Sequence, residues 1–271
     1  MEKLVFLGIG SNSLDKLNTS SFAVELNKGE WMLVDCGPDI PRQVTKAAKD
    51  GISFLNINYV LVTHRHLDHC LGLPYFLVGR NLERQARSRQ EPDFVPTKLH
   101  IIAEGEVWKK LQELFSLCHP DIGSLGFEVE HLEISSFMEV AKDLVNVKLQ
   151  TFIMDHAVPA YGFVISYFNK KKLAYSTDTL PTNTFIQAAS GVEILIHEAM
   201  VPASEIIFSK NTKHSTTKQA GEAIARIKPI KAFLMHIRPI FWDKRRSLEK
   251  EVLDVSGFQA EYPDEGSTVD L

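Results

Sequence analysis

Four residues that can bind a metal ion occur within six positions of the sequence, in the run His64-x-His66-x-Asp68-His69. Imidazole is a common ligand of zinc, and a carboxylate can bind or bridge a second ion. In an extended or turn segment, His64 and His66 point the same way and can share one metal, whereas Asp68 and His69 face a neighbouring position. The run therefore predicts a metal site rather than a chance cluster of solvated histidines.

Further candidate ligands follow other predicted strands: His156, Asp178 and His236. Taken alone, a histidine after a strand is more often structural, and an aspartate in a turn is usually a cap. Because strand ends gather at one rim of a sheet, however, residues distant in sequence can converge there. These three are the next strand-end ligands, in order, after a histidine cluster that needs partners.

The elements that must position these residues alternate between strands and helices in both halves of the chain. Strands are predicted at 3–8, 20–26, 31–34, 58–62, 98–103, 127–133, 145–153, 161–167, 172–176, 193–196, 231–235, 258–261 and 267–270. Helices are predicted at 38–50, 70–78, 105–117, 215–227 and 244–252. Two sheets packed on each other, each with helices outside, fit this order better than a single parallel sheet. We expect one α/β domain spanning 1–271, with an Arg-rich surface excursion at 79–98.

Composition narrows the class of protein. The 271 residues are 44% hydrophobic and 24% charged, which excludes a disordered or fibrous chain. The net charge of −4 excludes an overall basic coat for nucleic acid, and no uncharged run reaches the roughly 18 residues of a membrane span. The chain lacks a signal-peptide pattern, and its three cysteines have no paired spacing. We expect reduced thiols and a cytoplasmic location.

The H-x-H-x-D-H run, followed by His, Asp and His, resembles the signature of the metallo-β-lactamase superfamily. Within it, the chain is similar to the ribonuclease Z-like branch, through motifs that run nearly end to end. They are Asp35-Cys36-Gly37, His156-x5-Gly162, His197-Glu198-Ala199 and His214-Ser215-Thr216. The resemblance implies a four-layer αββα sandwich and a metal-dependent hydrolase.

The resemblance also implies a ligand set for two Zn²⁺ ions, with Mn²⁺ or another divalent metal as the alternative. By matching position, the first ion would take His64, His66 and His156, the second would take Asp68, His69 and His236, and Asp178 would bridge them. Di-iron redox relatives replace the second histidine of the run, so His66 favours hydrolysis. Class B β-lactamases commonly use a cysteine ligand, and none of the three cysteines here falls at such a position.

Two metals of this kind can hold a bridging hydroxide that attacks phosphorus. Asp68 would orient or deprotonate that water, and His214, supported by Glu198, would protonate the leaving group. Asp35 would hydrogen-bond a ligand histidine or a nearby loop. We expect structural or surface roles for the remaining histidines: His100, His119, His131 and His197.

The chain departs from ribonuclease Z proteins that process transfer RNA, which carry a long basic arm between the third ligand histidine and the bridging aspartate. Here His156 and Asp178 are 22 residues apart, which leaves room for two strands only. Another RNA-gripping stretch survives only as Asn18-Thr19-Ser20. Basic segments at 80–89 and 228–250 could bind phosphates instead. A solvent-exposed helix face without a ligand explains each segment equally well.

Three functions remain open from the sequence. The first is a binuclear zinc phosphodiesterase resembling ribonuclease Z, an endonuclease of the type that processes tRNA 3′ ends or a related phosphodiesterase. Its substrate would be an RNA 3′ end or a small phosphodiester. The second is a small-molecule hydrolase without RNA activity (a cyclic phosphodiesterase, or arylsulfatase-like or thioesterase-like), and the third is a non-catalytic zinc-binding protein. We expect no membrane partner, and a homodimer by analogy with the branch.

Overall fold

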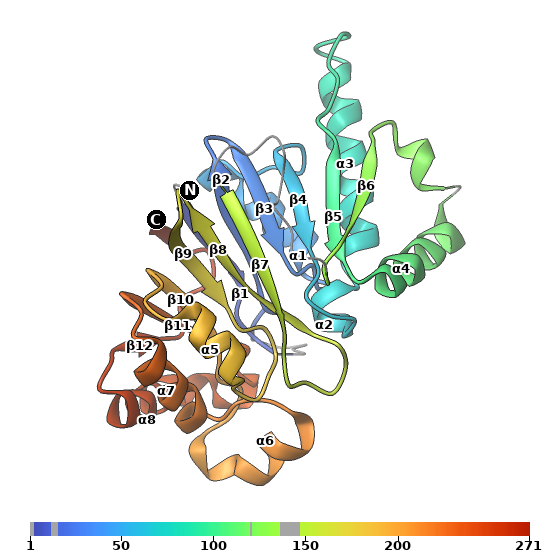
Figure 1. The fold of residues 1–271 in the computed structure, drawn as a ribbon. Helices are drawn as coiled ribbons and strands as arrows, with labels where there is room; N and C mark the ends of the chain where they lie inside the picture. Colours follow the sequence, from blue (N-terminus) through green and yellow to red (C-terminus); the bar gives the residue numbers. More distant parts are fainter. Residues whose placement is uncertain (1–2, 12–15, 120, 136–146) are drawn as a thin grey trace. The chain divides into compact units, whose positions relative to one another are not determined.

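The computed structural model describes residues 3–11, 16–119, 121–135 and 147–271. They form two compact units. The first unit comprises the N-terminus up to Gly8, Thr19–Ile134 and Glu265–Leu271, and the second comprises Ile9–Asn18 and Ser135–Asp264. Each unit contains one β-sheet and its own helices (Figure 1).

The first unit contains a seven-stranded sheet in the order β13-β1-β2-β3-β4-β5-β6. The strands are β1 (Lys3–Gly8), β2 (Ser21–Asn27), β3 (Glu30–Val34), β4 (Ile57–Leu61), β5 (Leu99–Ala103), β6 (Val129–Glu133) and β13 (Thr268–Asp270). Strands β13 to β3 pair antiparallel, and β3 to β6 pair parallel. All five residues of β4 are buried, as expected for a parallel strand covered on both faces.

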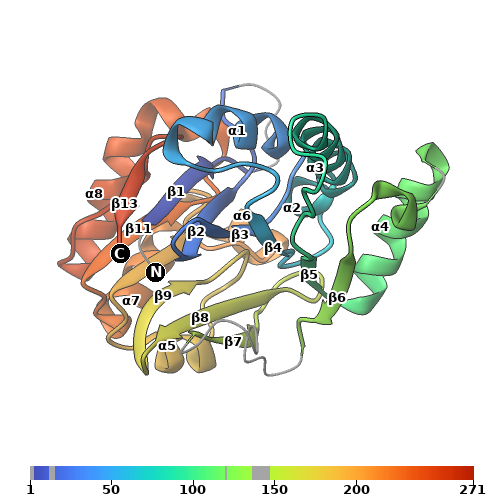
Figure 2. The same ribbon diagram turned by 90° about the horizontal axis from the view of Figure 1, so that it is seen from above.

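The parallel strands of this sheet are connected through helices. These are α1 (Ile40–Lys46), α2 (Leu67–Cys70), α3 (Leu73–Ser88) and α4 (Gly105–Cys118), with 3-10 turns at Ala47–Asp50 and Ile122–Leu125. Helices α1 and α3 lie on the same side of the sheet (Figure 2). Their apolar residues share one core with the strands, which includes Val44, Phe76 and Ile101. This core holds the end of β4, and the loop that follows it, in place.

The second unit contains a six-stranded sheet in the order β12-β11-β10-β9-β8-β7. The strands are β7 (Val147–Ile153), β8 (Tyr161–Tyr167), β9 (Lys170–Tyr175), β10 (Ile194–Glu198), β11 (Lys231–Met235) and β12 (Ala260–Glu261). Strands β7 to β9 are antiparallel, and β9 to β12 are parallel. The predicted strands agree closely, and the first two residues of the one expected at 145–153 lie outside the described part of the chain.

The helices of the second unit are α5 (Asn183–Ala189), α6 (Ile206–Thr212), α7 (Thr217–Ile227) and α8 (Arg245–Ser256), with 3-10 turns at Ala203–Glu205 and Pro239–Lys244. Helix α7 begins at a capping box. The Thr216 hydroxyl accepts from the Gln219 backbone N–H, and the Gln219 side chain accepts from the Thr216 backbone. This cap explains why the helix predicted from the Ser/Thr motif forms there. Among the described residues, no helix is long and apolar enough to cross a membrane.

The segment 79–98, expected to be an Arg-rich surface excursion, begins within a helix. Helix α3 continues to Ser88, and Arg80 is completely buried rather than exposed. Its guanidinium donates to the backbone carbonyls of Phe54, Ile57 and Thr97 and lies over the Phe127 ring. Burial lowers the pKa of Arg80 to about 10, so the side chain is charged at neutral pH. Arg80 is therefore a structural cation that joins α3 to the ends of β4 and β5.

We expect Arg80→Ala to lower the free energy of unfolding by roughly 3 kcal/mol, because it leaves buried carbonyls without a donor. Arg89→Ala is the matched control, since Arg89 is exposed and a surface substitution changes stability by about 0.5 kcal/mol or less. Urea unfolding followed by circular dichroism measures both. Equal midpoints for the two variants would contradict the structural role of Arg80.

Candidate metal centre

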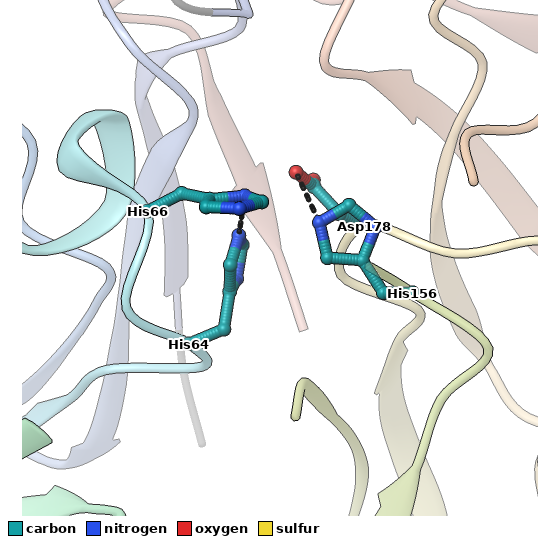
Figure 3. A group of neighbouring side chains, drawn as sticks. All are labelled: His64, His66, His156 and Asp178. Atoms are coloured by element: carbon teal, nitrogen blue, oxygen red, sulfur yellow. Dashed lines mark hydrogen bonds and ion pairs between the residues drawn. The ribbon is translucent and has the colours of Figure 1, made fainter. Parts of the chain in front are cut away.

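The first half of the candidate site follows β4 in the first unit. His64 Nε2 lies 3.1 Å from His66 Nδ1, with the two rings edge to face, and Figure 3 shows both side chains on the loop after that strand. Asp68 and His69 are buried at the start of the short helix α2, where Asp68 Oδ2 lies 3.7 Å from His69 Nε2. All four predicted ligands of this run are therefore gathered within a few ångströms of one another.

A buried carboxylate holds these histidines in position. Asp35 Oδ2 lies 2.8 Å from His69 Nδ1, and the Asp35 carboxylate also accepts from the backbone N–H and the hydroxyl of Thr63. The Thr63 hydroxyl in turn lies 3.0 Å from His64 Nδ1. Both imidazoles thus have Nδ1 engaged and Nε2 facing a further candidate ligand, His66 or Asp68, an arrangement common around protein metal sites.

The charge of Asp35 depends on these contacts. Burial raises the pKa of its carboxyl, while the His69 ring and the bonds from Thr63 act in the opposite direction. Asp35 itself adopts a φ of 59°, in the left-handed region that few non-glycine residues occupy. The predicted contact of Asp35 with a histidine of the H-x-H-x-D-H run is present, at His69.

The second half of the candidate site surrounds Asp178, which follows β9 in the second unit. One oxygen, Oδ2, lies 3.2 Å from His236 Nε2, 3.9 Å from His156 Nε2 and 3.9 Å from His214 Nδ1. Ligand atoms of Asp178, His214 and His236 all lie within 4.8 Å of one another, and all three residues are buried. Figure 3 shows the Asp178 carboxylate directed at the His156 ring. A carboxylate oxygen facing three imidazoles is a group that can bind a cation.

Unusual backbone conformations place these side chains. Thr177 (φ 48°), Lys213 (φ 60°) and His236 (φ 63°) all have left-handed φ values. Such values are disfavoured for residues with a Cβ, most strongly for a β-branched residue, and they cluster at functional sites. The turn at Lys213 directs its carbonyl to His156 Nδ1, 3.1 Å away, so that Nε2 of His156 is left facing Asp178.

His214 and Glu198, the predicted proton-transfer pair, do lie together. His214 Nδ1 is 3.2 Å from Glu198 Oε1, an oxygen that also accepts from the Thr179 backbone N–H. Burial raises the pKa of Glu198, and the neighbouring His214 opposes that rise. His214 also stacks on the His236 ring at 5.1 Å. Because its Nδ1 faces Asp178 as well, His214 could serve as a metal ligand, an alternative that reasoning from the sequence missed.

The remaining histidines have other surroundings, as predicted. His197 is buried, bonds the Glu198 carbonyl, and has a pKa lowered by burial to about 4. The others are engaged within the first unit, where His100 stacks on Tyr59, His119 on Phe115 and His131 on Trp108.

The residues present fit divalent metal ions. Imidazole nitrogens and carboxylate oxygens are the donors that zinc and manganese accept, and both half-sites are largely buried. Three of the imidazoles have one nitrogen committed to a protein acceptor or hydroxyl and the other facing a further candidate ligand: His64, His69 and His156. Imidazoles held through Nδ1 in this way have the orientation that metal coordination through Nε2 requires.

Comparison with known proteins defines the family. A family model described as "Beta-lactamase superfamily domain" matches residues 30–237, which is most of the chain. The chain therefore belongs to this superfamily, and its resemblance to the ribonuclease Z-like branch is confirmed by relatives of that name. It is a member of a family of metal-dependent hydrolases.

Two relatives illustrate the branch. A ribonuclease Z of Natronomonas pharaonis is 24% identical over 319 aligned positions, which cover 99% of this chain and 97% of that protein. Zinc phosphodiesterase ELAC protein 2 of Rattus norvegicus is 28% identical over 232 positions, covering 80% of this chain. The match spans only 27% of that longer protein.

Solved structures confirm the fold. Human tRNase Z, short form (ELAC1), superimposes with a TM-score of 0.76 at 17% identity, covering 98% of both chains. A diphosphatase from the PhnP family superimposes with a TM-score of 0.71 at 18% identity, covering 100% of this chain and 98% of the other. The predicted metallo-β-lactamase fold, with two sheets and their helices, is therefore correct.

We expect Asp35→Asn to weaken metal binding by about 10- to 100-fold, because the amide orients His69 less strongly than the carboxylate does. Competition with a chromophoric chelator measures the affinity. Asp39→Asn serves as the control, since Asp39 caps α1 without a side-chain hydrogen bond and should bind metal like the original protein. Equal affinities for the two variants would show that Asp35 does not support a ligand.

Proposed function

We propose that this chain is a binuclear zinc phosphodiesterase. The ligands would be His64, His66 and His156 for the first ion, Asp68, His69 and His236 for the second, and Asp178 between them. The observation that carries the proposal is the Asp178 carboxylate oxygen, which three imidazole nitrogens face at 3.2–3.9 Å. A carboxylate so surrounded is suited to bridge two cations.

The bound metals would supply Lewis acidity and a water nucleophile of lowered pKa for attack on a phosphodiester. The protein's own side chains would then orient the attacking water and transfer protons. Asp68, buried beside His69, would orient the attacking water or accept its proton. His214 would donate a proton to the leaving oxygen, and Glu198 would hold its ring through the 3.2 Å contact at Nδ1.

The substrate class follows from the relatives together with the short segment between His156 and Asp178. Relatives named ribonuclease Z and zinc phosphodiesterase favour a phosphodiester, and we propose RNA with a 3′ trailer as the first candidate. That segment contains only β8, β9 and short loops. The lack of an inserted arm there favours a small phosphodiester as the second candidate. A homodimer and a cytoplasmic location stay predictions from the sequence.

Three substitutions separate the proposed roles of metal ligand and proton donor. Asp178→Ala, like His66→Ala, should lose bound metal and activity together. His214→Ala should keep both metals, measured by plasma emission spectroscopy, and should lose roughly 100-fold or more in turnover, the usual contribution of a general acid. Loss of a metal from His214→Ala would make His214 a ligand, and full activity would end its assignment as proton donor.

The substrate is tested directly with the Zn- or Mn-loaded protein. We expect cleavage of a precursor transfer RNA with a 3′ trailer, with bis(p-nitrophenyl) phosphate as an internal control for the metal site. Turnover of the small diester alone would identify a small-molecule phosphodiesterase. If the fully metallated protein hydrolyses neither, the proposed function is wrong.

A further inference from the structure

The segment that follows His236 carries aromatic and basic residues outside the core. The 3-10 turn Pro239–Lys244 contains no buried residue, although it includes Phe241 and Trp242. Trp242 is the one tryptophan of the sequence that is not buried, since Trp31 and Trp108 both lie in the core. Phe241 and Trp242 are therefore both partly accessible to solvent.

Arginine side chains are ordered against these rings. The Arg238 guanidinium lies 4.7 Å from the Phe208 ring centroid and 5.9 Å from that of Phe241, and Arg245 lies 4.1 Å over Trp242. We name these five residues the aromatic–arginine platform. Arg238 and Arg245 form no salt bridge with any residue that the structure describes, and Arg245 Nε is buried there without a hydrogen-bond partner.

The charge around the platform is complementary to a polyanion. From 238 to 246 the chain has four basic residues against the single acid Asp243. Asp243 is itself paired with Lys16 at 2.7 Å. The platform therefore presents an excess of positive charge, even though the whole chain has a net charge of −4.

The platform is tied to the second half-site by short backbone links. Arg238 N–H donates to the Met200 carbonyl, and Met200 N–H donates to the Ser215 carbonyl, next to His214. Phe208 lies on α6 beside Ser209, whose hydroxyl donates to the His214 carbonyl. A ligand on the platform would thus lie on the same framework that carries His214 and His236.

We propose that the aromatic–arginine platform binds unpaired nucleotides of an RNA substrate, next to the phosphodiester that the metal centre hydrolyses. The placement of this RNA next to a reacting phosphodiester rests on the proposed function. Exposed rings stack on bases of any sequence, and arginines contribute phosphate contacts and further stacking. Bases must be unpaired to stack in this way, so the ligand is a single strand rather than a duplex.

Binding is measured without catalysis, on metal-free protein with a fluorescein-labelled oligouridylate of about 10 nucleotides, a length within the range of single-strand binding sites. We expect the RNA to quench the fluorescence of Trp242, and Trp242→Phe to abolish that quenching. Phe241→Ala combined with Trp242→Ala should weaken RNA binding at least about fivefold, the contribution of one stacked base. Circular dichroism confirms that the variant is folded.

The matched control is Phe94→Ala, because an arginine of the other basic segment, Arg87, lies 4.3 Å over the Phe94 ring but is paired with Glu91. It should bind the RNA like the original protein. An abasic ribose-phosphate strand of the same length tests whether charge alone is enough, and we expect it to bind more weakly and leave Trp242 unquenched. Equal binding by the abasic strand, or an equal loss in Phe94→Ala, would overturn the platform.

The binding and hydrolysis experiments distinguish failure of the platform from failure of the proposed phosphodiesterase activity. Hydrolysis of bis(p-nitrophenyl) phosphate without Trp242-dependent RNA binding would overturn the platform and leave the phosphodiesterase intact. Trp242-dependent binding by a metallated protein that cleaves neither substrate would support the platform and overturn the phosphodiesterase. Arg245→Ala should also reduce the slope of log affinity against log salt by about 0.7, the value for one phosphate contact on a single strand.

Discussion

The burial of a carboxylate among imidazoles is the constraint around which the second unit is organised. Asp178 is 1% exposed, and one of its oxygens faces His156, His214 and His236. Removing a carboxylate from water is costly unless positive charge or hydrogen bonds compensate for the loss. Three imidazole nitrogens that face one buried carboxylate oxygen mark a position that a divalent cation can occupy. The left-handed backbone at Thr177, adjacent to Asp178, is a further local cost that this arrangement accounts for.

Both half-sites use the same means of preparing a histidine for a metal. In the first unit Asp35 and Thr63 engage Nδ1 of His69 and His64, and in the second unit the Lys213 carbonyl engages Nδ1 of His156. Each contact selects the ring nitrogen that is left to coordinate. Thr63 is adjacent to His64, but Asp35 and Lys213 are 34 and 57 residues away from the histidines that they contact. A run of ligand types alone therefore does not define the orientation of its rings.

Much of the fold was predictable from local pattern, and the candidate ligands lie together within each unit. The strands β8 and β11 match their predicted bounds, because each is a buried apolar run that ends at a turn. Arg80 was misjudged because arginine in a charged stretch usually lies in solvent, and only the fold reveals the carbonyls of Phe54, Ile57 and Thr97 that it satisfies. For the same reason the approach of His214 to Asp178 could not be read from their spacing in the chain.

Recognition of a substrate is a separate problem from chemistry at a metal site. The ligand set can act on many esters, so selectivity must come from groups around it. In the part of the chain that the structure describes, the basic segments 80–89 and 228–250 place their arginines differently. Arg80 is buried in the core, and Arg87, which lies over the Phe94 ring, is paired with Glu91. Arg238 and Arg245 stack on partly exposed rings beside the loops of His236 and His214. Arginines stacked on aromatic rings next to the proposed metal centre favour an extended substrate that carries bases. A compact diester has no bases to stack on these rings.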